Sequence, residues 1–372
     1  MMSQINPAIL ITTLLKPKGS PILYQLKIEF STDDAAPISS PYVGEVGSLS
    51  VVTPAEMSVS GGQLVFTNAT SRAAIAHSGN QARANGLALV TRAGQGSGST
   101  HNIEVGVLGT SNNRLFYLAP RSGGGFITTN TDANYLNYYE GSEALISLTP
   151  TRYALIVHAD GGVSAFEYVS SAWTHIWREY TNTDANIRLG IWPWTLAGGS
   201  STVVADYFRV ALLPAPFNSE WATAYAASPS GSYTGTANQL LDMTLTAPGT
   251  ITTEAGLQYR VQDANNYWRV YFNTSGALRV DSVEAGVATN RANVAGIISA
   301  GATRRVRVIM YGGTQRIFTE TAGVWTQRAS VTGNTTFSTQ TSIATDVGAG
   351  WTAANLRSYP RTSAQYAILD NV

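Results

Sequence analysis

Hydrophobic and polar residues alternate along much of this chain with a period of two. Such alternation is typical of β-strands that face a core on one side and solvent on the other. Clear examples are residues 25–30, 103–107, 305–309 and 316–319. The apolar run 153–157 predicts a strand buried on both faces. Glycine-rich turns separate the runs, and few stretches have helical spacing with caps; the best, 218–227, predicts one or two helical turns at the domain junction. The sequence therefore predicts an all-β protein.

The second half of the chain repeats the first at a spacing of about 153 residues. Six short matches occur in the same order. They are Ala84-Asn85-Gly86-Leu87 with Ala237-Asn238-Gln239-Leu240, Asn112-Asn113 with Asn265-Asn266, Gly161-Gly162 with Gly312-Gly313, Trp173-Thr174 with Trp325-Thr326, Trp194-Thr195 with Trp351-Thr352, and Ala205-Asp206-Tyr207 with Ala364-Gln365-Tyr366. We therefore expect two related domains in tandem, an arrangement that favours binding or assembly over catalysis.

The rhythm of strands and short turns in each half favours a two-sheet antiparallel β-sandwich, or jelly roll. We predict a first sandwich at 24–213 and a second, shorter one at 214–372, with the prolines of 212–216 as a linker. The first half carries extra strand-like segments at 47–52 and 57–66, so the second sandwich is expected to be a trimmed version of the first.

Composition narrows the function classes. The 372 residues contain 23 basic and 23 acidic side chains, so no charge-driven binding of nucleic acid or membrane is expected. Charged residues make up 12%, and 18 Tyr and 8 Trp supply large amphipathic surfaces. Because net charge protects a monomer from association, this surface suits either a homo-oligomer or neutral polar ligands such as sugars. The absence of Cys excludes disulfides and thiolate metal sites, and no cofactor is expected.

Residues 1–23 stand apart from the repeat. The apolar stretch 7–15 has no basic residue before it and no small-residue cleavage site after it. It is also too short to span a bilayer, so we expect synthesis in the cytoplasm without a signal peptide and no membrane insertion. One interpretation is an assembly arm that adds a strand to a neighbouring subunit; the other is an edge strand of its own domain. The arm would act through Ile9, Leu10, Ile11, Leu14 and Leu15.

A strand–turn–strand phrase recurs in both halves. The two copies are 153–166, followed by Trp173, and 305–318, followed by Trp325. Together with 265–270 and 276–280, this order resembles the concanavalin A-like, laminin-G-like jelly-roll modules over about residues 45–372. Such modules occur in bacterial surface proteins and tailed-phage virion proteins. The paired glutamates of glucanase members and the clustered Asp and Asn of calcium-binding lectin members have no counterpart here, so the resemblance implies neither activity.

No catalytic or metal-binding set emerges from the acidic residues and histidines. Two carboxylates that cleave a glycosidic bond must flank that bond, and on one strand face this requires acidic residues two or four positions apart. Glu140 and Glu143 are three positions apart and do not meet this requirement. The four histidines show no metal-ligand spacing.

Aromatic residues are the better candidates, since Trp and Tyr stack on the apolar faces of sugars. Trp173, Trp325, Trp194 and Trp351 are matched between the halves, so we interpret them as packing residues. The candidate glycan or subunit contacts are Trp192, Tyr138, Tyr139, Trp177 and His175.

These observations predict a non-enzymatic phage virion protein, from a tail, a fibre or the particle surface. It would assemble with itself and with other virion proteins, and could bind cell-surface glycans. The alternative is a bacterial carbohydrate-binding or adhesin protein, and a third option is a polysaccharide-degrading enzyme.

Overall fold

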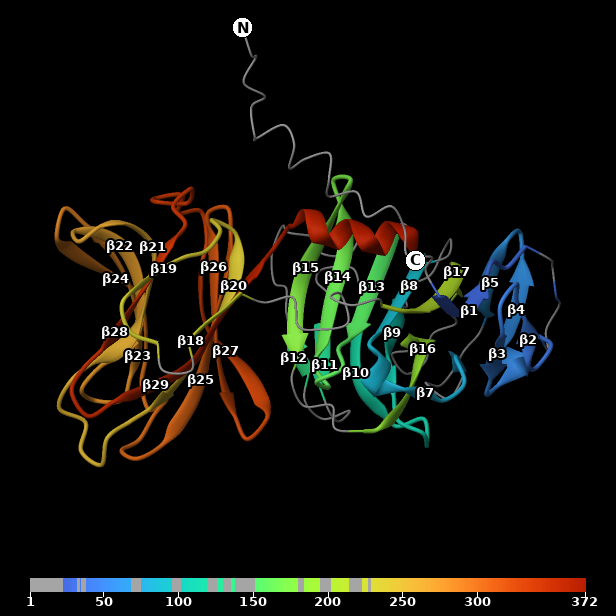
Figure 1. Ribbon diagram of the computed structural model, residues 1–372, viewed down its shortest axis with the longest axis horizontal. Helices are drawn as coiled ribbons and strands as arrows, with labels where there is room; N and C mark the ends of the chain where they lie inside the picture. Colours follow the sequence, from blue (N-terminus) through green and yellow to red (C-terminus); the bar gives the residue numbers. More distant parts are fainter. Residues whose placement is uncertain are drawn as a thin grey trace, which may run out of the picture.

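The computed structural model describes residues 23–31, 34, 38–67, 75–95, 102–119, 126–129, 135–137, 151–179, 184–194, 202–213, 223–226 and 229–372. Within these residues the chain forms two β-sandwiches that lie side by side (Figure 1). The predicted all-β, two-sandwich architecture is confirmed. The proposed arm residues Ile9 to Leu15 lie outside the described part.

The first sandwich consists of an eight-stranded and a nine-stranded antiparallel sheet. The eight-stranded sheet has the order β15-β14-β13-β8-β17-β5-β4, with β1 also paired to β17. Its strands are β1 (Leu23–Ile28), β4 (Met57–Ser60), β5 (Gln63–Thr67), β8 (Leu87–Gln95), β13 (Thr151–Val157), β14 (Val163–Val169), β15 (Ala172–Glu179) and β17 (Thr202–Leu212). The nine-stranded sheet has the order β12-β11-β10-β9-β16-β6-β3-β2, with β7 also paired to β16. Its strands are β2 (Tyr42–Val43), β3 (Ser48–Val51), β6 (Ala76–His77), β7 (Gln81–Ala82), β9 (Asn102–Leu108), β10 (Arg114–Ala119), β11 (Phe126–Thr129), β12 (Tyr135–Asn137) and β16 (Asn186–Trp194).

The second sandwich consists of two six-stranded antiparallel sheets. The sheet that faces the first sandwich, here the proximal sheet, has the order β18-β29-β20-β25-β26-β27. Its strands are β18 (Thr223–Ala226), β20 (Gln239–Thr246), β25 (Thr303–Tyr311), β26 (Thr314–Thr321), β27 (Val324–Val331) and β29 (Thr352–Pro360). The other, the distal sheet, has the order β19-β28-β21-β22-β23-β24. Its strands are β19 (Ser232–Thr234), β21 (Ala255–Asp263), β22 (Asn266–Phe272), β23 (Leu278–Glu284), β24 (Val287–Val294) and β28 (Ser342–Val347). Three short 3₁₀ helices complete the described elements: η1 (Pro54–Glu56), η2 (Arg83–Asn85) and η3 (Ala364–Asn371).

The two sandwiches share one topology. The path β15-β14-β13-β8-β17 of the eight-stranded sheet corresponds to β27-β26-β25-β20-β29, and β12-β11-β10-β9-β16 corresponds to β24-β23-β22-β21-β28. Even a β-bulge recurs, between Ala165 and Phe166 and again between Ile317 and Phe318. The duplication inferred from short sequence matches is therefore a duplication of structure. β7 and β19 pair with equivalent ends of β16 and β28, and the extra strands β2 to β6 lie in the first copy.

Two local predictions are wrong. Residues 223–226, inside the expected helix, form β18 because the free edge of β29 offers them hydrogen-bond partners. The match of Ala205-Asp206-Tyr207 with Ala364-Gln365-Tyr366 also fails, since the first lies in β17 and the second in η3. The structural counterpart of β17 is β29.

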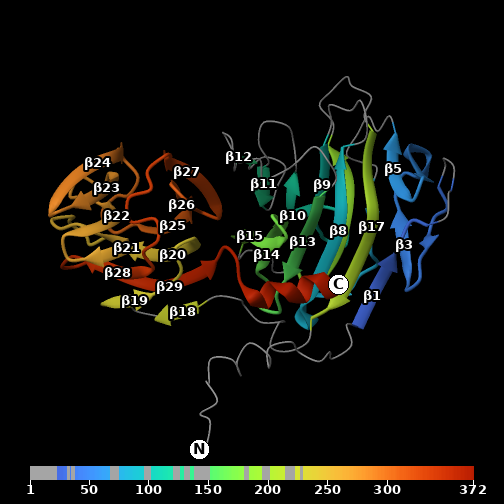
Figure 2. The ribbon, with the colours of Figure 1, turned by 90° about the horizontal axis from the view of Figure 1, so that it is seen from above.

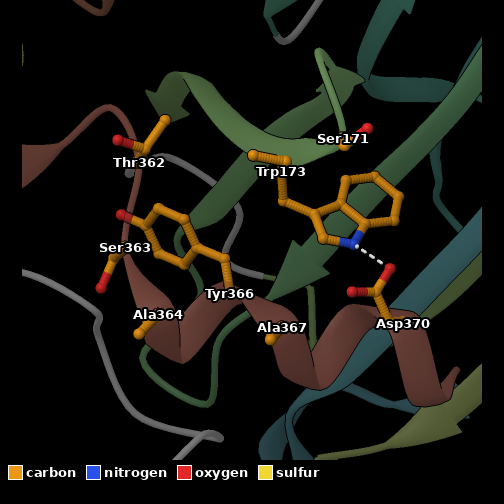
Figure 3. Close-up of a pocket in the computed structure, with 9 residues that line it drawn as sticks. Ser171, Trp173, Thr362, Ser363, Ala364, Tyr366, Ala367 and Asp370 are labelled. Atoms are coloured by element: carbon orange, nitrogen blue, oxygen red, sulfur yellow. Dashed lines mark hydrogen bonds between the residues drawn. The ribbon is translucent and has the colours of Figure 1, made fainter.

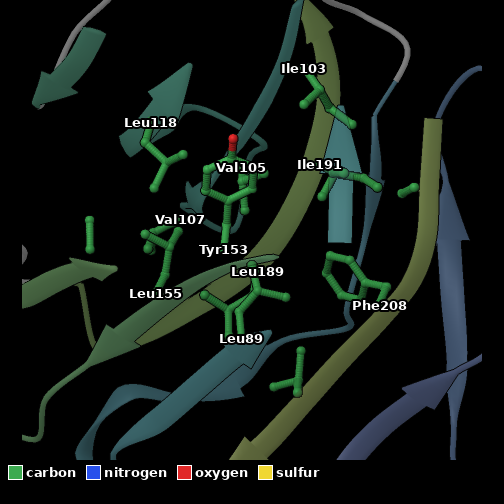
Figure 4. Packing of buried hydrophobic residues seen from close by; sticks show 14 of the residues in the cluster. Leu89, Ile103, Val105, Val107, Leu118, Tyr153, Leu155, Leu189, Ile191 and Phe208 are labelled. Carbon is green, nitrogen blue, oxygen red and sulfur yellow. The ribbon is translucent and has the colours of Figure 1, made fainter. Parts of the chain in front are cut away.

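Alternation builds the core of the first sandwich as expected. Leu89 and Leu155 from the eight-stranded sheet meet Val105, Leu189 and Ile191 from the nine-stranded sheet (Figure 4). The run 153–157 is buried throughout, as its continuous apolar character indicates. Its inward side chains enter this core, while Ala154 and Ile156 point to the opposite face of the sheet.

The proximal sheet packs its outer face against the first sandwich. Trp177 on β15 meets Phe318 at a ring-centroid distance of 5.4 Å and Trp325 at 5.9 Å, both edge to face. The guanidinium of Arg307 lies 4.3 Å from the Trp177 ring and 4.2 Å from the Trp325 ring. It also donates two hydrogen bonds of 2.7 Å to the carboxylate of Asp242. A buried, charge-paired core thus joins the two sandwiches.

The C-terminal segment returns from the second sandwich to the first. After β29 the chain runs into η3, which lies across the outer face of the eight-stranded sheet (Figure 2). Tyr366, Leu369 and Val372 pack there against residues such as Val90 and Phe166. This crossing ties the two sandwiches together at a second place.

One buried acid gives the fold a pH dependence. Burial raises the pKa of Glu167 to about 9, although Arg361 nearby opposes the shift. Because the folded chain holds a proton that the unfolded chain has already lost, the free energy of unfolding should fall from pH 7 to pH 9 by about 2–3 kcal/mol. His175, whose pKa burial depresses, changes stability only at lower pH, below its unfolded value.

Urea unfolding at pH 7, 8 and 9 measures this fall. Glu167→Gln should remove most of it and leave the smaller part due to buried Glu179, whose pKa burial raises to about 7. Glu284→Gln, at an exposed site, should leave the fall intact. A wild-type stability that stays constant or rises over this range would refute the assignment.

Candidate ligand-binding face of the second sandwich

Each sandwich has two outer sheet faces, and three of the four are closed among the described residues. η3 covers the eight-stranded sheet, and the first sandwich covers the proximal sheet. On the nine-stranded sheet a packed cluster of Ile75, Leu108, Tyr117 and Trp192 is buried. The outer face of the distal sheet instead carries polar side chains that are partly exposed. This face is the candidate site.

Strand alternation selects which residues reach the candidate site. Leu257, Val270 and Val280 point into the core of the second sandwich, so their neighbours on β21, β22 and β23 point outward. These residues, together with Glu254 immediately before β21 and Asn290 on β24, form a group here called the distal cluster. It consists of Glu254, Arg269, Tyr271, Arg279, Asp281 and Asn290.

Asp281 organises the distal cluster. Its buried carboxylate accepts hydrogen bonds from Tyr271 Oη and Asn290 Nδ2, both at 2.8 Å, from Arg269 Nη2 at 3.0 Å, and from Arg279 Nη2 at 3.4 Å. Burial alone would raise the pKa of Asp281, but the hydrogen bonds outweigh it and keep the pKa below its ordinary value. The carboxylate is therefore a fixed anion that orients its donors.

The two arginines and Glu254 remain open to solvent. Side-chain exposure is 20% for Arg269, 33% for Arg279 and 43% for Glu254. Arg269 stacks its guanidinium 4.0 Å from the Tyr271 ring centroid and lies 3.6 Å from Glu254. Two cations balance two anions, so the face offers convergent hydrogen-bond donors and acceptors without a net charge. Such a surface suits a neutral, hydroxyl-rich ligand.

The first sandwich carries the same arrangement in closed form. Glu104 and Gly106 on β9 correspond to Glu254, which immediately precedes β21, and to Gly256 on β21. Arg114 and Tyr117 on β10 correspond to Arg269 and Tyr271 on β22. Arg114 lies 3.7 Å from Glu104, close to the 3.6 Å in the second sandwich. We call Glu104, Arg114, Tyr117 and Trp192 the closed cluster.

The glycine is required in both copies because the tyrosine lies against it. A Cβ placed on Gly106 would fall 2.6 Å from the Cβ of Tyr117, and one on Gly256 would fall 2.5 Å from the Cβ of Tyr271. Neither tyrosine could keep its position beside a larger residue.

Trp192 makes the difference between the copies. It pairs with Glu104 across β16 and β9, donates its indole Nε1–H to the Glu104 carboxylate, and meets Tyr117 edge to face at 5.7 Å. In the second sandwich the residue paired with Glu254 is Gly348, whose N–H donates to the Glu254 carbonyl at 2.9 Å. Glu104 is consequently 0% exposed, whereas Glu254 is 43% exposed.

The structure corrects three site predictions. Trp192, Trp177 and His175 are all buried, so none is available to a ligand at the surface of the chain. Trp192 packs in the closed cluster and Trp177 joins the sandwiches. His175 stacks on Phe166 at 4.7 Å. The sequence alone does not show which face of a sheet is covered, so it does not distinguish a buried aromatic ring from an exposed one. Tyr138 and Tyr139 lie outside the described residues.

The packing role expected for the matched tryptophans is confirmed for Trp173, Trp325 and Trp351, which are buried. Sequence reasoning missed the distal cluster. One signal for it exists: Glu104-Val105-Gly106 and Glu254-Ala255-Gly256 share a Glu-x-Gly phrase at nearly the repeat spacing. The arginine and tyrosine on the neighbouring strand become visible only once the strand register is known.

Among the described residues, no group of three or more His, Asp or Glu side chains is arranged to hold a metal ion. The helices of the described part are all too short or too polar to cross a bilayer.

No protein-family model matches the chain, and no curated protein matches its sequence. Among solved structures it is similar to the carbohydrate-binding module CBM66 from Bacillus subtilis, with 13% identity over 37% of this chain and 93% of that module, at a TM-score of 0.28. It is similar to galectin LEC-6 from Caenorhabditis elegans, with 13% identity over 37% and 89% of the two chains, at 0.26. A GH43 protein from Bacillus licheniformis matches with 9% identity over 69% and 73%, at 0.31. The β-sandwich class of this chain rests on its own four sheets.

Proposed function

We propose that this chain is a non-enzymatic carbohydrate-binding protein, whose second sandwich holds a sugar ring on the distal cluster. The observation that carries the proposal is the pairing of one closed and one open copy of the same cluster. In the first sandwich Trp192 covers the cluster, whereas in the second sandwich the cluster is open to solvent. The open copy offers a surface to a ligand, and Trp192 indicates what that ligand resembles.

Trp192 indicates the shape of the ligand. In the closed cluster a flat ring rests near the Arg114 guanidinium, 5.3 Å from it, and directs one N–H donor to Glu104. A pyranose offers the same combination, a ring with an apolar face and hydroxyl donors at its rim. Over the distal cluster, such a ring would lie against Arg269 and donate a hydroxyl to Glu254.

The geometry favours binding over hydrolysis. Cleavage of a glycosidic bond needs one carboxyl group that gives up a proton. Asp281 is held as an anion by four donors, and its pKa is lowered. It therefore positions the arginines and does not act as a general acid. An adhesin or another glycan-binding protein is accordingly better supported than a polysaccharide-degrading enzyme.

The test combines a glycan array with titration calorimetry on the full chain. Wild type should bind at least one array glycan, and Arg269→Ala should weaken that binding at least about tenfold, because hydrogen bonds to charged groups contribute about 1.5–3 kcal/mol. Arg291→Ala is the matched control: this arginine belongs to the same sheet but contacts Ser282 and Glu284 instead. Equal binding by wild type and Arg269→Ala, or no glycan binding at all, would overturn the proposal.

The virion role, the homo-oligomer and the arm of residues 1–23 stay predictions from sequence. A phage particle component that binds host glycans would use the distal cluster in the same way as a bacterial carbohydrate-binding protein. The glycan test therefore addresses an activity that both kinds of protein would have.

A further inference from the structure

A hollow lies where the C-terminal segment meets the first sandwich. It measures about 390 Å³ and opens to solvent between the β14–β15 hairpin and η3 (Figure 3). Its lining includes Ser171, Trp173, Thr362, Ser363, Tyr366 and Asp370. The volume falls within the range of about 300–1,000 Å³ that is usual for small-molecule pockets. No residue of this hollow belongs to the distal cluster.

The Asp370 carboxylate of the hollow is held in place by two hydrogen-bond donors. Trp173 Nε1 and Arg152 Nη2 both donate to Oδ1 of Asp370, at 3.1 and 2.7 Å. The Arg152 guanidinium is itself stacked 4.2 Å from the Tyr168 ring and 4.9 Å from the Trp173 ring. The Asp370 side chain is nevertheless 44% exposed. A fixed carboxylate with its charge balanced by Arg152 thus faces the hollow beside an indole.

Ser171 adds an independent observation. It sits at the tip of the hairpin with φ +65°, after Ser170 with φ +50°. Two-residue turns of this kind favour glycine or asparagine, because a side chain is strained in the left-handed region. The duplicated hairpin has Gly323 at the corresponding position, with φ +82°. Ser171 therefore places a hydroxyl at the rim of the hollow, where the twin hairpin has no side chain.

We infer that this hollow binds the end of a neutral sugar chain. The hydroxyls of Ser171, Thr362 and Ser363 can both donate and accept, and the Asp370 carboxylate accepts. These groups carry no net charge together with Arg152 and so match a hydroxyl-rich ring, while the buried Trp173 indole holds Asp370 in place through its N–H. The inference concerns a separate site and does not depend on the distal cluster.

The experiment uses the full chain carrying Arg269→Ala, so that the distal cluster does not contribute. Glucose, galactose, mannose and N-acetylglucosamine are titrated while the indole N–H resonance of Trp173 is followed by NMR, assigned with Trp173→Phe. At least one sugar should shift this resonance, and Asp370→Asn should weaken its binding at least fivefold. Failure of all four sugars to shift it would overturn the inference.

Ser171→Gly provides the sharper test. It should raise the thermal midpoint, because glycine relieves the strain, and at the same time weaken sugar binding at least threefold. A purely structural serine would give the higher midpoint with unchanged binding, and this result would also overturn the inference. Ser230→Gly, at an exposed serine of the second sandwich, is the matched control and should leave binding unchanged. Loss of array binding by Arg269→Ala together with a persisting Trp173 shift would separate this site from the distal cluster.

Discussion

Replacing Arg307 with alanine is expected to lower the free energy of unfolding by about 3–5 kcal/mol. Arg307 is fully buried between the two sandwiches, where it makes two 2.7 Å hydrogen bonds to Asp242 and lies between Trp177 and Trp325. Its removal leaves the carboxylate of Asp242 buried without its cation. The cost of that unpaired charge, more than the lost attraction, sets the size of the effect.

Two variants separate this explanation from a general loss of packing. Arg307→Met combined with Asp242→Leu removes both charges, so it should recover a large part of the lost stability. Arg291→Ala breaks an exposed ion pair of 3.7 Å with Glu284 and should cost at most about 1 kcal/mol. Chemical denaturation of all three proteins provides the comparison. A loss below 1 kcal/mol for Arg307→Ala would show that the interface does not depend on this pair.

Trp177→Ala should produce the second large effect, about 3–5 kcal/mol, because it empties the centre of the same interface. Its ring contacts Phe318 and Trp325, which belong to the second sandwich. We also expect the sandwiches to lose their coupling, so that calorimetry resolves two thermal transitions where the wild type shows one.

Trp177→Phe, which keeps an aromatic ring at the same place, should retain a single transition. If Trp177→Ala also unfolds in one transition at the wild-type midpoint, the two sandwiches are not coupled through this ring.

The strands and the duplication could be predicted because both depend on local pattern. Alternation located β9, β25 and β26, and the double glycines at 161–162 and 312–313 fall in equivalent hairpin turns. Residues 223–226 were misassigned because a short start signal for a helix is weak, whereas pairing with β29 is a long-range interaction that no local pattern reports.

The candidate site was less predictable. Trp192 looked like an exposed ligand contact because it has no partner in the second half, and the structure shows that this asymmetry has the opposite meaning. Trp192 closes its own copy of the cluster, and Gly348 leaves the other copy open. Which face of a strand is covered depends on elements distant in sequence, such as η3 on the eight-stranded sheet. The two copies of the cluster thus differ in exposure, and the open copy lies in the second sandwich.

A crystal structure of the full chain with a glycan selected on the array would test the proposed site most directly. We expect a sugar ring on the outer face of the distal sheet, against Arg269, with a hydroxyl within hydrogen-bond distance of the Glu254 carboxylate. A glycan bound at another surface, with the distal cluster empty, would contradict this expectation.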